Sequence, residues 1–124
     1  MEPKAVVERC LAEVLAGSGS SEELISDESF RQRVAGFRSA FPDLEVTTHV
    51  LLAEGELVAS HFSGSGTHRG VFQGVPPTGK KWEARATAVF RVEDGRIADA
   101  WVNWDLLALM EQLGGVERAP TVSA

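Results

Sequence analysis

Two titratable side chains in this sequence stand at positions from which they could transfer a proton to or from a bound molecule. The first is His68, which stands in the segment Gly-Thr-His-Arg-Gly. Counting in steps of two from Phe62 and Gly64 places His68 on the inner face of a predicted strand. A histidine near neutral pH can act as an acid or as a base. In the structural alternative, its imidazole hydrogen-bonds the backbone of the loop from Gly70 to Gly79.

Asp105 is the second candidate for proton transfer. It directly follows Trp104 at the end of the last predicted strand, where a pocket would open. Because an Asp before an apolar helical segment also serves as an N-cap, capping is the alternative role. Asn103 should face outward by alternation, and Asp27 and Glu28 fall in a solvent-facing first turn, so these three are weaker candidates.

The positions of the other two histidines and of the cysteine indicate structural roles and no metal site. His49 and His61 fall on the outer faces of neighbouring predicted strands, where they can form a cross-strand pair or lie in a dimer interface. They have no visible third metal ligand. Cys10 is the only cysteine, which excludes an internal disulfide and a cysteine-based zinc cluster. It falls on the apolar stripe of a predicted helix, which favours a place in the core.

The elements that would position these residues follow one another in an α+β order. Apolar periodicity predicts helices over residues 3–16, 26–41 and 106–113, and strands over 44–52, 58–65, 81–92 and 97–104. Ser26 or Asp27 can cap the second helix, and Pro42 ends it because proline disfavours helix at the preceding residue. The Asp94-Gly95 turn joins the last two strands as a hairpin, so we expect antiparallel pairing.

Alternation assigns a face to each residue of these strands. The third strand is the clearest, with an inner face of Trp82, Ala84, Ala86, Ala88, Phe90 and Val92 and an outer face that includes Glu83, Arg85 and Thr87. In the first strand, the same rule assigns Val50 and Leu52 to the inner face.

The alanines of the third strand leave volume above the predicted sheet. Phe62, Trp82, Phe90 and Trp104 would surround this volume with aromatic surface, which is typical of a small-molecule pocket. In the alternative, the helix over residues 26–41 packs closer to the sheet and fills the space.

Composition limits the classes of function. A chain of 124 residues with 44% hydrophobic and 24% charged residues is typical of one globular domain, here residues 1–124. A net charge of −6 argues against a nucleic-acid partner, and no apolar run is long enough to cross a membrane. The first ten residues have early acids and no apolar core typical of a secretion signal, so we expect a cytoplasmic protein. Residues 115–124 have no periodicity and predict a frayed tail.

Four segments of the chain resemble a known family: AFPDLEV, GTHRGVFQGVPPTGK, FRVEDGRIADAW and WDLLALMEQLG. They are similar to those of the SnoaL-like polyketide cyclases, in the superfamily shaped like nuclear transport factor 2. The resemblance runs from about Val6 to Gly114. It implies a curved antiparallel sheet forming a cone, with helices packed on its concave face. It also implies ring closure by an intramolecular aldol condensation, without metal or cofactor, although relatives also act in hydroxylation, isomerisation or epoxide opening.

The chain departs from this family at the positions that carry its usual chemistry. Counting back from Gly114, the family's proton-abstracting aspartate falls at Val102, and a histidine two residues before it falls at Ala100. A further pocket histidine on the preceding strand falls at Ala88. A general base must reach the proton that it removes, and the side chain of Val102 has no basic group. The standard mechanism therefore does not transfer by position.

The resemblance and its departures together predict a cyclase-like enzyme of polyketide, antibiotic or related natural-product biosynthesis that orients a hydrophobic substrate. The catalytic candidates remain His68 and Asp105. The predicted substrate-binding residues are Phe62, Trp82, Ala84, Ala86, Ala88, Phe90, Ala100, Val102 and Trp104. The alternatives are a non-catalytic small-molecule binding protein and a hydroxylase, isomerase or epoxide-opening enzyme with relocated catalytic groups.

A homodimer is also expected. Trp101 is a large aromatic residue on a predicted outer face, where it needs a cover. With Val89 and Ile97 it would form an apolar patch for a partner sheet. The resemblance adds that relatives commonly dimerise through this surface.

Overall fold

The computed structural model describes residues 2–15, 17 and 21–117. Its elements are α1 (Pro3–Arg9), the π-helical turn η1 (Cys10–Val14), α2 (Ser21–Leu24), α3 (Glu28–Ala40), β1 (Glu45–Glu54), β2 (Leu57–Thr67), β3 (Lys81–Glu93), β4 (Arg96–Trp104) and α4 (Leu106–Leu113). Most of the predicted tail, residues 118–124, lies outside the described residues, as does Ala16 at the end of the first predicted helix.

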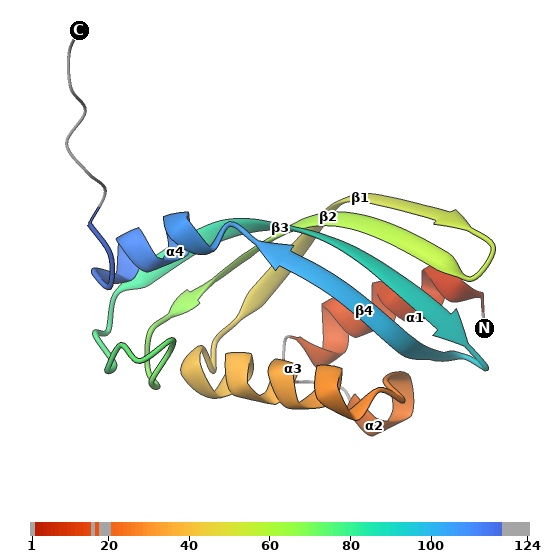
Figure 1. Ribbon diagram of the computed structural model, residues 1–124, viewed down its shortest axis with the longest axis horizontal. Coiled ribbons are helices and arrows are strands. Elements are labelled where there is room, and N and C mark those ends of the chain that lie inside the picture. Colours follow the sequence, from red (N-terminus) through yellow and green to blue (C-terminus); the bar gives the residue numbers. More distant parts are fainter. Residues whose placement is uncertain (1, 16, 18–20, 118–124) are drawn as a thin grey trace, which may run out of the picture.

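The four strands form one antiparallel sheet in the order β1-β2-β3-β4. Figure 1 shows this sheet arching over α1 and α3, with α4 at the end of the sheet where β4 finishes. The predicted α+β class, a curved antiparallel sheet with helices on its concave face, is therefore confirmed. No helix within the described residues has the length and apolar character needed to cross a bilayer.

The register of β3 follows the predicted alternation. Ala84, Ala86 and Ala88 are buried on the inner face, whereas Glu83 and Arg85 are exposed. Alternation of this kind arises because successive side chains in a strand point to opposite sides of the sheet. The predicted inner face of β3 is thus confirmed.

The prediction for β1 is wrong beyond His49. Thr48 pairs with Phe62, but the next pair joins Val50 to His61, so one extra residue is inserted in β1. A β-bulge of this kind reverses the faces of all following residues. Val50 and Leu52 are consequently 45% and 64% exposed on the outer face, instead of facing the helices.

A second irregularity changes the position of Ile97. The β3–β4 register shifts between Arg91 and Val92, so Ile97 pairs with Val92 and is fully buried. The prediction that Ile97 lies on the outer face is therefore wrong. Val89 and Trp101 do lie there, with 37% and 54% of their surface exposed.

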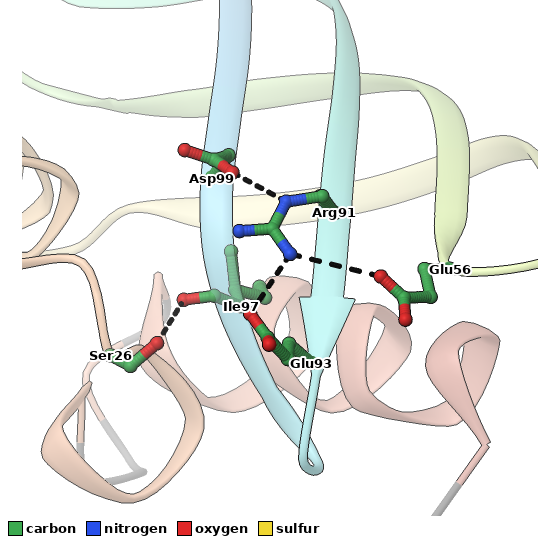
Figure 2. Close-up of polar contacts among 6 residues, drawn as sticks. All are labelled: Ser26, Glu56, Arg91, Glu93, Ile97 and Asp99. Atoms are coloured by element: carbon green, nitrogen blue, oxygen red, sulfur yellow. Dashed lines mark hydrogen bonds and ion pairs between the residues drawn. The ribbon is translucent and has the colours of Figure 1, made fainter.

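The edge of β4 at Ile97 is covered by the segment before α3. Ser26 donates two hydrogen bonds to the Ile97 carbonyl, from its backbone N–H (2.9 Å) and its hydroxyl (3.2 Å), and Figure 2 shows the second. Ser26 therefore binds the sheet edge and does not cap α3. Asp27 holds the N-cap position, without a side-chain capping bond.

Arg91 joins the β3–β4 hairpin to the β1–β2 turn on the outer side of the sheet. Its guanidinium donates to Asp99 (2.6 Å) and Glu93 (2.9 Å) and forms a longer ion pair with Glu56 (3.7 Å; Figure 2). The hydrogen bonds from Arg91 to Glu93 and Asp99 hold its pKa above the usual range. Partly exposed pairs contribute little one by one, so the main effect of this cluster is to fix the hairpin.

The first predicted helix divides into α1 and a π-helical turn. Leu15 donates its N–H to the carbonyl of Cys10, five residues earlier, which inserts an extra residue into one turn. Cys10 is buried in the core, as predicted, and burial raises the pKa of its thiol to about 12. A thiol held protonated in this way is a poor nucleophile.

Asp43 joins the end of α3 to the end of β2. Its carboxylate accepts hydrogen bonds from both the backbone N–H and the hydroxyl of Thr67, each at 2.7 Å. These bonds favour the charged form and lower the pKa of Asp43 below its usual value.

We expect Asp43→Asn to destabilise the protein in a pH-dependent way. Because the pKa of Asp43 is lower in the folded state, its contribution is present above the unfolded-state pKa of about 3.9 and is lost as the pH falls through the folded value. The melting temperature of the variant should lie below that of the parent at pH 7, and the difference should shrink towards pH 3. Glu54→Gln, at an exposed carboxylate, is the control. An equal difference at all pH values would contradict this role.

Candidate functional site

A cavity of about 550 Å³ opens between α3, the sheet and the loop that follows β2. This volume falls within the range of small-molecule sites. The described residues that line it are Leu15, Phe30, Arg33, Val34, Gly36, Phe37, Phe62, Val71, Phe72, Gln73, Phe90, Val102, Asn103, Trp104 and Leu106. Most of these side chains are aromatic or aliphatic, so an apolar ligand would bury its surface against apolar walls.

The helix α3 supplies one wall through helical spacing. Phe30, Val34 and Phe37 recur at intervals of four and three residues, which places them on one side of the helix. Arg33 lies beside them, with its guanidinium carbon 5.4 Å from the centre of the Phe30 ring. The same helical face therefore presents aromatic surface and one cation to the cavity.

The opposite wall depends on the indole of Trp104. This side chain starts on β4, yet its ring would lie only 2.6 Å from a Cβ atom built at Gly64 on β2. Because β3 lies between these strands, the indole must cross β3, where Ala84 and Ala86 are the inward side chains. Phe37 then stacks on the indole, with ring centres 4.8 Å apart and an interplanar angle of 15°. The small residues of the sheet thus make room for Trp104.

The predicted substrate-binding residues separate into two groups. Phe62, Phe90, Val102 and Trp104 line the cavity. Trp82, Ala84, Ala86, Ala88 and Ala100 lie outside the lining. Among these, Trp82 packs against Phe41 and Trp104, with ring centres 4.8 and 5.9 Å apart. Ala84 and Ala86 support the wall from behind, because the Trp104 indole crosses β3 at these two residues.

His68 lies outside the cavity lining and is fully buried. Its Nδ1 atom lies 2.9 Å from the Thr78 hydroxyl and accepts the backbone N–H of Thr78 at 3.3 Å. Since that N–H only donates, Nδ1 is the acceptor of this bond, while the buried Nε2 has no hydrogen-bond partner among the described residues. The backbone of His68 also pairs with Lys80 and Gly79. These contacts place His68 at the base of the loop over residues 68–80, as in the structural alternative.

Asp105 holds the N-cap of α4. Its carboxylate accepts the backbone N–H of Ala108 at 3.2 Å, which satisfies one of the free donors of the first turn. The neighbours on either side, Trp104 and Leu106, line the cavity, whereas Asp105 does not. Its carboxylate is therefore engaged with the helix that follows.

The polar side chains that line the cavity are Arg33, Gln73 and Asn103. The sequence singled out only Asn103, as a weaker candidate on the outer face, and it gave no prediction for Arg33 or Gln73. Arg33 had a detectable signal, since it stands three residues after Phe30 on a predicted amphipathic helix. Gln73 had none, because its loop has no periodicity. Among the described lining residues there is no Asp, Glu or His, and the residues that the structure leaves undescribed also contain none of the three in sequence.

The comparisons with known proteins agree with this architecture. The family model described as SnoaL-like polyketide cyclase matches residues 2–113. The chain belongs to the SnoaL-like polyketide cyclase family. A search of curated proteins gave no significant match to this SnoaL-like protein.

Solved structures of the same shape carry different functional names. IdmH from Streptomyces antibioticus, described as a candidate polyketide cyclase, is 28% identical, with a TM-score of 0.75 over 92% of this chain and 99% of IdmH. AclR from Streptomyces galilaeus, described as a candidate hydroxylase, is 25% identical, with a TM-score of 0.75 over 95% and 84%. TsrD from Streptomyces laurentii shares the fold at 24% identity, with a TM-score of 0.74 over 90% and 94%. Family membership therefore does not by itself fix the reaction.

We expect Gly64→Ala to displace the Trp104 indole. The new methyl group would lie 2.6 Å from the ring, so the wall of the cavity must move. Overpacking of this kind costs about 1–3 kcal/mol, measurable as a lower melting temperature with a changed near-ultraviolet circular dichroism spectrum.

Gly36→Ala is the matched control for this variant. A Cβ atom at Gly36 meets no atom within 4 Å, and alanine favours helix over glycine by about 1 kcal/mol. Its stability should be equal or higher. If Gly64→Ala left both the melting temperature and the spectrum unchanged, the packing of Trp104 on Gly64 would be refuted.

Proposed function

We propose that this SnoaL-like protein is a cyclase-like enzyme of polyketide or related natural-product biosynthesis, acting in the cytoplasm without metal or cofactor. The observation that carries the proposal is the lining of the cavity, which is aromatic and aliphatic apart from Arg33, Gln73 and Asn103. Such a cavity suits a flexible hydrophobic substrate that must be folded before it reacts.

An intramolecular aldol reaction is compatible with this lining. A bond forms between an α-carbon and a ketone carbon of the same molecule, the α-carbon loses a proton to water, and the ketone oxygen gains one. No atom is added or lost overall. Holding the two carbons at reacting distance supplies several kcal/mol of the barrier through orientation alone. We therefore assign the main effect to the shape of the cavity, and structural roles to His68 and Asp105.

The alternative function is non-catalytic binding of an aromatic or terpenoid small molecule. The same lining favours it, because no carboxylate or imidazole of the described residues faces the cavity. Turnover of a linear substrate distinguishes the two: an enzyme yields a cyclised product that is isomeric with the substrate, and a binding protein returns the substrate unchanged.

We expect cyclisation to depend weakly on pH between about 6 and 9, because the described residues that line the cavity include no Asp, Glu or His. His68→Gln and Asp105→Asn should each lower kcat/KM by no more than about tenfold. Val102→Phe should lower it by about a hundredfold or more, since it removes volume that positions the substrate. Val116→Phe, at an exposed valine outside the lining, is the matched control.

The opposite pattern would overturn the shape-based mechanism. A steep acidic limb in the pH–rate profile, together with near-complete loss of activity in His68→Gln or Asp105→Asn, would show that one of these residues is the acid or base. Circular dichroism spectra of each variant separate loss of chemistry from loss of fold.

The outer face of the sheet supports a homodimer, which we also propose. Leu52, Ala59, Val89 and Trp101 pair in register and form one apolar stripe across all four strands. Three of the four are large exposed side chains, with Leu52 at 64% and Trp101 at 54%. A continuous stripe of this kind is self-complementary under two-fold rotation, so a second copy of the chain covers it.

Trp101→Glu should convert the dimer into a monomer. A charge placed within an interface of standard size, about 1,600 Å² in total, is buried without a partner. Light scattering at micromolar concentration should give twice the chain mass for the parent and one chain mass for the variant. Val116→Glu, away from the stripe, should remain dimeric. A parent that is monomeric under these conditions would exclude this interface.

A further inference from the structure

We propose that Arg33 makes the cavity selective for ligands with an anionic oxygen head group, such as a carboxylate, phenolate or enolate, on an apolar body. This inference deepens the proposed function and rests on it, because it assumes that the cavity binds a hydrophobic small molecule.

Arg33 carries a positive charge in a chain whose net charge is negative. The protein has a net charge of −6, yet Arg33 is the only charged side chain among the described residues that line the cavity. An apolar site in an acidic protein needs no cation for stability. A guanidinium at such a site raises the local concentration of anionic ligands and opposes cationic ones.

The donors of Arg33 are free, in contrast to those of its neighbours on α3. Arg31 donates to the Ile25 carbonyl at 3.1 Å, and Arg38 lies at hydrogen-bond range from the Gly17 carbonyl, at 3.5 Å. Within the described part of the chain, Arg33 has neither a hydrogen bond nor an ion pair. Its contact is with the ring of Phe30, at 5.4 Å from the centroid. A cation–π contact holds the guanidinium in place without using its N–H donors.

The position of Arg33 defines how the ligand would lie. Its side chain is exposed, so it stands where the cavity meets solvent, while Phe62 and Phe90 are almost fully buried at the inner wall. The apolar body of a ligand would therefore enter first, and the charged oxygen would remain beside the guanidinium. Gln73 adds an amide donor from the loop that lines the same cavity.

Two fluorescent probes with one aromatic body test this inference. N-phenyl-1-naphthylamine is neutral, and 8-anilino-1-naphthalenesulfonate adds a single anionic group to the same rings. In titrations at low salt, Arg33→Gln should raise the dissociation constant of the anionic probe about three- to tenfold. The dissociation constant of the neutral probe should stay within about twofold of the parent value. Higher salt should lower the affinity of the parent for the anionic probe, and should lower that of the variant much less. The reason is that salt screens the charge of Arg33, which the variant lacks.

Arg38→Gln is the matched control, since it removes the same charge from the same helix outside the cavity lining. It should change neither affinity. Val102→Phe should lower the affinity for both probes. Because Val102 lines the cavity, this loss would show that both probes bind there. If the neutral probe fails to bind the parent, or Val102→Phe leaves both probes unaffected, the proposed function fails and the inference with it. If both probes bind in the cavity but Arg33→Gln changes the two affinities equally or not at all, the inference alone is overturned.

Discussion

The packing of Trp104 is the interaction on which the site depends. Its indole spans from β4 across β3 to Gly64 on β2, and Phe37 stacks on it from α3. This arrangement requires small side chains beneath the ring, which is why the inner face carries Gly64, Ala84 and Ala86. One aromatic side chain thereby joins sheet to helix and forms a wall of the cavity. Larger residues in the sheet would force the ring outward, because a packed interior has little room to relax.

The polar groups that first suggested chemistry serve the scaffold around this cavity. His68 binds Thr78 at the base of the loop over residues 68–80, and Asp105 satisfies the first turn of α4. Each therefore lies close to the site without facing it. The same proximity explains why their types and positions matched a catalytic pattern, since the loop and α4 are both next to the cavity.

Three local irregularities decide which side chains reach which surface. The bulge at His49 turns Val50 and Leu52 outward, and the register shift after Arg91 buries Ile97. The π-helical turn ends at Val14 and is followed by Leu15, which reaches the cavity. A single inserted residue reverses the alternation of a strand. The bulge in β1 therefore adds Leu52 to the apolar stripe that Ala59, Val89 and Trp101 form on the outer face.

The sequence by itself determined the fold class, the family and the faces of β3, because regular alternation and turn residues act locally and can be counted. It also identified Phe62, Phe90, Val102 and Trp104, which line the cavity. Only the tertiary structure decided that the alanines support Trp104, that His68 points to its own loop, and that Arg33 faces the cavity. The reason is physical: a side chain's partner depends on elements distant in sequence, and bulges insert residues without a periodic signal.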